Sequence, residues 1–273
     1  MTSLNPTQIT NQFSPPKLLI ASGRAWFGVA AIGQLAFIGF ILVYYGTRTL
    51  AGDYAAWNDK QLIDGHIEGD PIGNLSFAAH VFIAAIMTLT GLLQLWPRLR
   101  RDAPRLHRYS GRVFLITACF LALSGLGLGL IRGTYLSYVS LVAISFNAVL
   151  ILVFAGFTVR FAVQRQIAQH QIWAMRLFLV ANGVWFLRVG MMGWLVLAQG
   201  PVGMTSTLSG PADIVLVFGC YLIPLAVYEI YRQAQQRQTA LLTVPALCVM
   251  ALATAFTALG VFGTIGFMWL PEL

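Results

Sequence analysis

Two histidines set among arginines are the residues of this chain best suited to hold a cofactor. His107 and His170 each lie just before a long apolar run, so both are expected near the same depth at one membrane face. Paired imidazoles from two helices hold b-type haem in membrane bundles. Arg108, Arg112 and Arg176 could bind its propionates. A quinone or another anionic ligand fits the same pattern. So does the simpler interpretation that the arginines bind anionic lipid headgroups.

The segment before His107 bears on whether a flat group would fit there. If Asp102 caps the following helix, His107 falls in the second turn of that helix. Gly111, four residues further on, then lies on the same face and leaves room beside the imidazole. The segment therefore predicts an N-cap at Asp102 and open space beside Gly111.

A second group of polar residues lies inside apolar runs. We expect these residues to line a ligand pocket: His80, Gln94, Asn147, Trp185 and Arg188. A charge near the middle of a membrane span costs ~3 kcal/mol or more. Arg188 therefore requires a counter-charge, backbone carbonyls or an anionic ligand, and neither Asp213 nor Glu229 is expected at its depth. For His80, the simpler interpretation is a satisfied histidine in a helix-packing seam, and a ligand, proton or metal role is the alternative.

Membrane-spanning helices must position these residues. Of the 273 residues, 58% are hydrophobic and 10% are charged, whereas soluble domains carry roughly 25% charged residues. Seven apolar runs are long enough to cross a bilayer: 25–45, 75–96, 113–131, 138–158, 177–198, 214–231 and 240–270. We predict an all-α polytopic bundle, with a tail over 1–24 and one transmembrane domain over 25–273 whose core bundle is 75–198. Pro224 is expected to kink the sixth span.

The distribution of charge predicts the orientation of the spans. The loop 97–112 carries six arginines against one acid, which is typical of a cytoplasmic loop. We therefore expect the N-terminus inside, the C-terminus outside, and the cytoplasmic (inner) membrane as the location. The net charge of +8 follows from this asymmetry, so the expected partners are the bilayer and anionic headgroups rather than nucleic acid. The acidic segment 64–70 reads as a solvated loop, and no metal site is predicted.

Three features together resemble a family of bacterial multi-pass membrane proteins of unknown function. They are the histidine at His80, an HRxxGR element that begins at His107, and HQIWAMR, which begins at His170. In the last, Ala174 stands where the family pattern expects tryptophan directly followed by methionine. The resemblance covers roughly residues 75 to 190. It implies no established activity.

The four central spans are also distantly similar to the cytochrome b561 architecture, in which histidines on four helices hold two haems. Here the fourth span has Asn147 and no histidine. The resemblance therefore implies at most one haem, held by His107 and His170, and leaves His80 without a partner.

Three functions stay open from the sequence. The first is a ligand-binding or redox membrane protein that uses haem or quinone. The second is a small-solute transporter or permease, and the third is a structural membrane subunit. No nucleophile elbow, phosphate-binding loop or zinc spacing is present in the sequence. Enzymatic activity, a small anionic ligand and homo-oligomer formation stay open as well.

Overall fold

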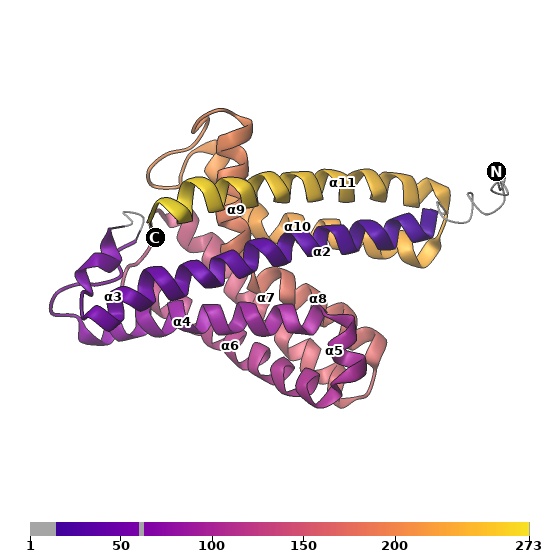
Figure 1. Ribbon diagram of the computed structural model, residues 1–273, viewed down its shortest axis with the longest axis horizontal. Helices are drawn as coiled ribbons and strands as arrows, with labels where there is room; N and C mark the ends of the chain where they lie inside the picture. The colour runs from indigo at the N-terminus through magenta and orange to yellow at the C-terminus, as the bar shows by residue number, and fades with distance from the viewer. Residues whose placement is uncertain (1–14, 60–62, 273) are drawn as a thin grey trace, which may run out of the picture.

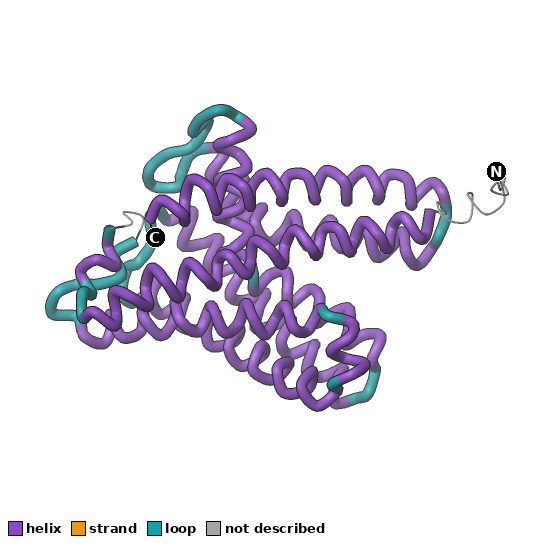
Figure 2. The backbone as a smooth tube through the Cα atoms, viewed as in Figure 1, coloured by secondary structure: helices purple, strands orange, loops and turns teal. Residues whose placement is uncertain are grey.

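The computed structural model describes residues 15–59 and 63–272, and within these ranges the chain is helical with short loops and no strand (Figure 2). The prediction of an all-α polytopic bundle is confirmed. Among the described residues, six helices are long and apolar enough to cross a membrane, and a bent pair adds a seventh crossing when it counts as one span.

The spanning elements follow one another along the chain with short connections. They are α2 (Pro15–Phe40), which continues through the π-helical turn η1 (Ile41–Tyr45) into α3 (Gly46–Ala51), then α4 (Pro71–Leu95), α6 (Pro104–Leu130), α7 (Tyr138–Val163), the bent pair α8 (Ile167–Ala181) and α9 (Gly183–Leu197), α10 (Pro211–Arg237), and α11 (Ala240–Gly263) with η3 (Thr264–Trp269). The short elements are η2 (Ala55–Asn58), α5 (Pro97–Asp102) and η4 (Leu270–Glu272).

The two ends of the bundle differ in charge. The start of α2 and the arginine-bearing α5 lie at one end, which we call the basic end (Figure 1). Helix α3 and the C-terminus lie at the opposite end, which we call the far end (Figure 1). A chain that starts at one end and finishes at the other crosses an odd number of times, which agrees with seven crossings.

Helix pairing builds the core from small and apolar residues. The most extensive contacts join α4 with α6, α7 with α8, and α11 with both α2 and α9. At the α9–α11 contact, a side chain at Gly260 would collide with the backbone carbonyl of Val189. Only glycine permits that approach, which is how small residues hold membrane helices together.

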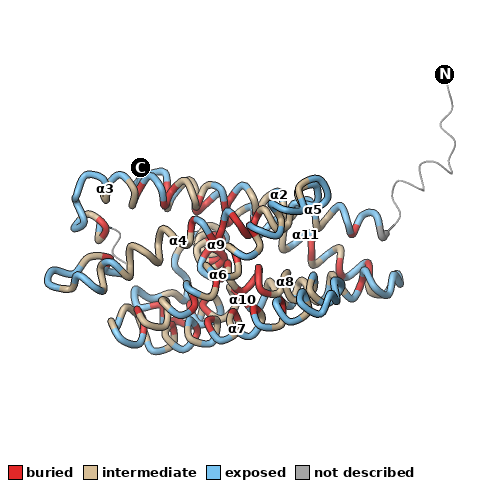
Figure 3. The backbone as a smooth tube through the Cα atoms, turned by 90° about the horizontal axis from the view of Figure 1, so that it is seen from below, coloured by how far each residue is buried: buried red, intermediate tan, exposed pale blue. Residues whose placement is uncertain are grey.

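The outer surface of the bundle is apolar. Large hydrophobic side chains such as Leu50 and Ile131 are 91% and 89% exposed, as expected of residues that face lipid rather than water. Buried residues concentrate in the middle of the molecule, around α9 (Figure 3). Polar groups in this interior are shielded from water, so they need hydrogen-bond partners there.

Two details differ from the sequence predictions. Helix α2 begins at Pro15, so part of the expected tail 1–24 extends the first span, while residues 1–14 lie outside the described residues. Pro224 lies inside α10, and the kink expected there stays a prediction. The fifth span, predicted as one helix over 177–198, instead bends by 56° between α8 and α9.

The bend has a local cause at Asn182. Its backbone leaves the helical region, with φ −89° and ψ 14°, and its side-chain amide donates a hydrogen bond to the Phe178 carbonyl at 2.8 Å. A side chain that bonds the preceding turn in this way competes with the regular helical ladder. The break therefore lies in the middle of an otherwise apolar span.

Candidate functional site

The break at Asn182 brings polar side chains from three parts of the chain into the bundle interior. Asn147 of α7 lies against the break, because a side chain added at Gly183 would come within 2.8 Å of its amide nitrogen. Two residues further along α9, the Trp185 ring lies within 2.8 Å of a side chain added at Gly33 of α2. Gln34, the next residue on α2, is fully buried.

These side chains carry polar atoms without protein partners. In the described part of the chain, eight buried side-chain nitrogen or oxygen atoms have no hydrogen bond. Five of the eight are both amide atoms of Gln34, Oδ1 of Asn147, Oδ1 of Asn182 and Nε1 of Trp185. Leaving one such atom unpaired costs about 1–3 kcal/mol. Native proteins pair such atoms with water or ligand, so these atoms are available to hydrogen-bond molecules from outside the chain.

Arg188, one turn beyond Trp185, adds a positive charge to this cluster. Its guanidinium donates to the Val184 carbonyl of its own helix at 3.2 Å and lies 5.4 Å from the centre of the Phe37 ring. Within residues 15–59 and 63–272, no carboxylate forms an ion pair with it. We call Gln34, Asn147, Asn182, Trp185 and Arg188 the polar centre.

The two acidic residues considered as partners of Arg188 are engaged elsewhere. Asp213 accepts hydrogen bonds from the backbone N–H groups of Thr205 and Gly210, at 2.8 and 3.0 Å. Glu229 forms ion pairs with Arg176 and Arg232, each at 2.7 Å. The contacts described for the Arg188 guanidinium are therefore the Val184 carbonyl and the Phe37 ring.

His80 lies in the α4–α6 seam. Its Nδ1 is 2.8 Å from the Ser124 hydroxyl, and a side chain at Gly125 would lie 3.5 Å from its ring. Gln94 is separate, because it bonds Ser110 at 2.6 Å at the basic end. Of the five predicted pocket residues, the three that lie near the helix break are therefore Asn147, Trp185 and Arg188.

The predicted histidine pair lies at the basic end. His107 lies near the start of α6, and His170 lies near the start of α8. Nδ1 of His170 is 3.0 Å from the Thr158 carbonyl, whereas Nδ1 of His107 is buried and has no partner among the described residues. Haem binding by these two residues stays a prediction.

The surroundings of that pair differ from those predicted. Asp102 does not cap α6: the N-cap is Ala103, and Asp102 instead pairs with Arg101 at 2.7 Å. The space beside Gly111 is filled by Gln94, whose Oε1 would lie 2.9 Å from an added side chain. Arg176 is held by Glu229, whereas Arg108 and Arg112 are exposed, with no ion pair to a described acid.

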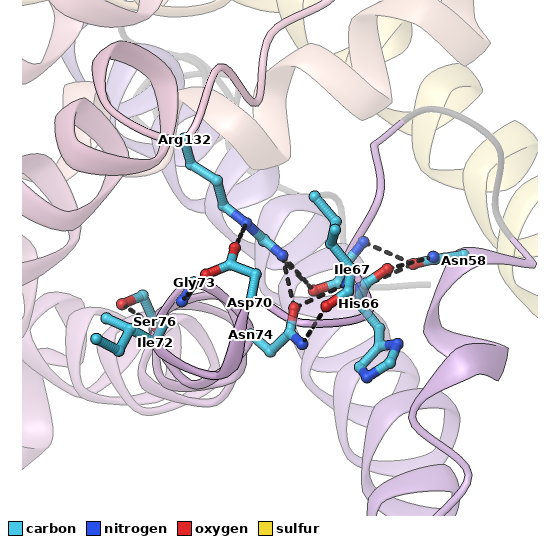
Figure 4. Close-up of polar contacts among 10 residues, drawn as sticks. Asn58, His66, Ile67, Asp70, Ile72, Gly73, Asn74, Ser76 and Arg132 are labelled. Atoms are coloured by element: carbon cyan, nitrogen blue, oxygen red, sulfur yellow. Dashed lines mark hydrogen bonds and ion pairs between the residues drawn. The ribbon is translucent and has the colours of Figure 1, made fainter.

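A contrasting polar group forms at the far end, and Figure 4 shows its contacts. Arg132 donates to Asp70 at 2.9 Å, to Asn74 at 2.7 Å and to the Gly65 carbonyl at 3.4 Å. Asn58 in turn accepts from the backbone N–H of Gly65 at 2.7 Å. We call these five residues the loop network. They tie the loop after α3 to the ends of α4 and α6.

Asp70 takes part in this network through its side chain. It caps α4 by accepting from the Gly73 N–H at 2.9 Å. The Gly73 N–H, and then the guanidinium of Arg132, hold the pKa of Asp70 below its ordinary value. Over 15–59 and 63–272, no three histidine, cysteine or acidic residues are arranged to hold a metal ion.

Comparison with known proteins assigns the central part of the chain to a protein family. Residues 77–232, from α4 to α10, match the family model described as predicted membrane protein (DUF2306). The chain belongs to this family. No curated protein and no solved structure matches the chain. The DUF2306 match includes every residue of the polar centre except Gln34, which lies on α2.

The DUF2306 region also forms most of the wall of an apolar cavity that sequence reasoning missed. The cavity has a volume of about 510 Å³ and lies between α2, the α8–α9 pair, α10 and α11. No sequence signal for it exists, because residues that line an apolar cavity have the same composition as residues that face lipid.

Proposed function

We propose that this protein binds a small anionic ligand inside the membrane at the polar centre. The observation that carries the proposal is Arg188, a guanidinium on a membrane-spanning helix with no carboxylate partner among the described residues. Such a charge costs ~3 kcal/mol or more at the centre of a bilayer. A bound anion would offset this cost. Among the functions that the sequence leaves open, this supports ligand binding.

The neighbouring orphan atoms narrow the chemistry of the ligand. The N–H of Trp185 and the guanidinium of Arg188 are donors suited to an anionic group. Oδ1 of Asn147 and Oδ1 of Asn182 are acceptors and require a donor from the ligand. A small molecule that combines a carboxylate with a hydroxyl group would satisfy both sets, so we take a hydroxy-carboxylate as the ligand class.

Matched probes test this proposal in the purified protein. Lactate carries both groups, whereas propionate lacks the hydroxyl. At constant ionic strength, lactate at ten times its dissociation constant should stabilise the folded protein by about 1.4 kcal/mol. Propionate should bind more weakly because the asparagine acceptors stay unpaired. The unfolding midpoint in detergent measures both effects.

Two substitutions locate the effect. Arg188→Met should remove the stabilisation by lactate, whereas Arg98→Met should retain it, because Arg98 is exposed in α5 and forms no ion pair with a described acid. Equal stabilisation of both variants, or none of the wild-type protein by either carboxylate, would contradict the proposal.

The helix break favours transport as a second candidate function. Transporters commonly bind substrates where a discontinuous helix exposes the positive end of a half-helix near the bilayer midplane. Helix α9 starts at Gly183 inside the bundle, after the 56° bend. Uptake of labelled lactate by proteoliposomes would distinguish transport from binding, since a binding protein without transport activity would give none.

A further inference from the structure

The apolar cavity described above is elongated along α10. Its lining includes Val215 near the start of that helix and Tyr231 near its end. Sixteen residues of helix separate them, a length of ~24 Å. This exceeds the ~15 Å of one membrane leaflet, half of a hydrocarbon core of ~30 Å. The cavity therefore has the length and the apolar lining that a long hydrocarbon chain requires.

The polar groups of the cavity concentrate at the basic end. Arg24 is the charged residue of its lining, and Tyr231 lines the cavity as well. Tyr231 itself packs on α2, because a side chain at Gly23 would lie 2.7 Å from its hydroxyl. Arg24 is exposed, and no described acid forms an ion pair with it.

The charges near this end have a positive surplus. Glu229 is shared by Arg176 and Arg232, so this group of three carries a net charge of +1. Arg24 adds a second positive charge. An anionic group at the membrane surface would therefore be attracted to the mouth of the cavity.

We infer that the cavity holds one hydrocarbon chain of an anionic phospholipid, with the phosphate of the lipid bound by Arg24. The apolar length accounts for the chain, and the arginine at one end accounts for the headgroup. The site is separate from the polar centre: α9 turns Phe186 and Gly190 to the cavity, whereas Trp185 and Arg188 do not line it. The inference therefore does not rest on the proposed function.

Lipid retention tests the inference. Purified protein is equilibrated in mixed micelles with equal amounts of phosphatidylglycerol and phosphatidylcholine, and the retained lipid is measured by native mass spectrometry. We expect about one retained lipid, with phosphatidylglycerol preferred about fivefold, the factor that one interfacial arginine contributes. Absence of a preference would contradict the headgroup assignment. Retention of a co-purified quinone in place of phospholipid would overturn the proposed occupant.

Two pairs of variants separate the chain from the headgroup. Ala253→Trp places a ring in the cavity and should abolish retention, whereas Ala251→Trp, an exposed position of the same helix outside the cavity lining, should not. Arg24→Gln should remove the preference but keep a retained lipid, and Arg98→Gln should change neither. Full retention by a folded Ala253→Trp protein would overturn the inference. Arg24 is exposed, so its variant tests the headgroup even where the Trp variant does not fold.

Discussion

Arg132 and Arg188 are two arginines in one bundle with opposite surroundings. Arg132 is 8% exposed in its side chain and donates to a carboxylate, an amide oxygen and a backbone carbonyl. Arg188 has a carbonyl of its own helix and an aromatic ring. The first arginine has a full set of partners within the chain, and the second does not.

This difference separates structural from functional polar groups. In the loop network, Asn58, Asp70 and Asn74 all have protein partners, so the network contributes to the stability of the folded state. In the polar centre, orphan atoms of Gln34 and Asn182 add a cost that the folded chain alone does not offset. A site that is incomplete without a ligand has this pattern.

The largest expected effect is on the loop network. Arg132→Ala removes hydrogen bonds to Asp70, Asn74 and the Gly65 carbonyl, and bonds of charged groups contribute about 1.5–3 kcal/mol. We expect the free energy of unfolding in mixed micelles to fall by about 2–3 kcal/mol. The matched change Arg98→Ala on the exposed α5 should stay within about 0.5 kcal/mol. Equal stability of the two variants would mean that the network is not structural.

The polar centre should respond in the opposite direction. Gln34→Met replaces a buried amide, both of whose polar atoms lack protein partners, by an apolar side chain of similar length. Without ligand, we expect the free energy of unfolding to stay unchanged or to rise by up to about 1 kcal/mol. Gln94→Met removes an amide bonded to Ser110 and His107, and should lower it by about 1 kcal/mol. Destabilisation by Gln34→Met beyond that of Gln94→Met would remove the contrast.

The smallest expected effect is on pH dependence. The N–H of Gly73 and the guanidinium of Arg132 lower the pKa of Asp70 below its ordinary value of 3.8. A carboxylate with a lowered pKa stabilises the folded state above the ordinary value, and this contribution is lost as pH falls through the lowered pKa. Asp70→Asn keeps a capping side chain but removes the titration. Unfolding midpoints measured from pH 5 downwards should therefore fall less steeply for Asp70→Asn than for the wild type.

Much of the fold could be predicted because apolar length and period are local properties. The seven runs and the arginine-rich loop indicated an all-helical bundle, and the seam around His80 followed from helical spacing. The break within 177–198 was missed because the run is apolar throughout. The dipeptide Asn182-Gly183 was the available signal, since this pair favours turns.

Only part of the candidate site could be predicted, because a charged residue in an apolar run is conspicuous in the sequence and an uncharged polar residue is not. Arg188 drew attention because a charge in an apolar run is costly wherever its partner lies. Gln34 is uncharged and isolated within its run, so nothing in its neighbours indicates that it is buried in the bundle interior. The bond between Arg132 and Asp70 joins residues 62 positions apart. Such contacts depend on how the helices pack, which spacing within one helix does not reveal.

The packing of α2 against α11 has a consequence for biosynthesis. These helices are the first and the last spans of the chain, they lie side by side (Figure 1), and both fall outside the matched region 77–232. During insertion, α2 enters the bilayer before its main partner has been translated. Until α11 is made, the face of α2 that it covers, where Gly33 lies against Val261, is exposed to lipid or to the translocation machinery. Packing of that face therefore waits for the synthesis of α11.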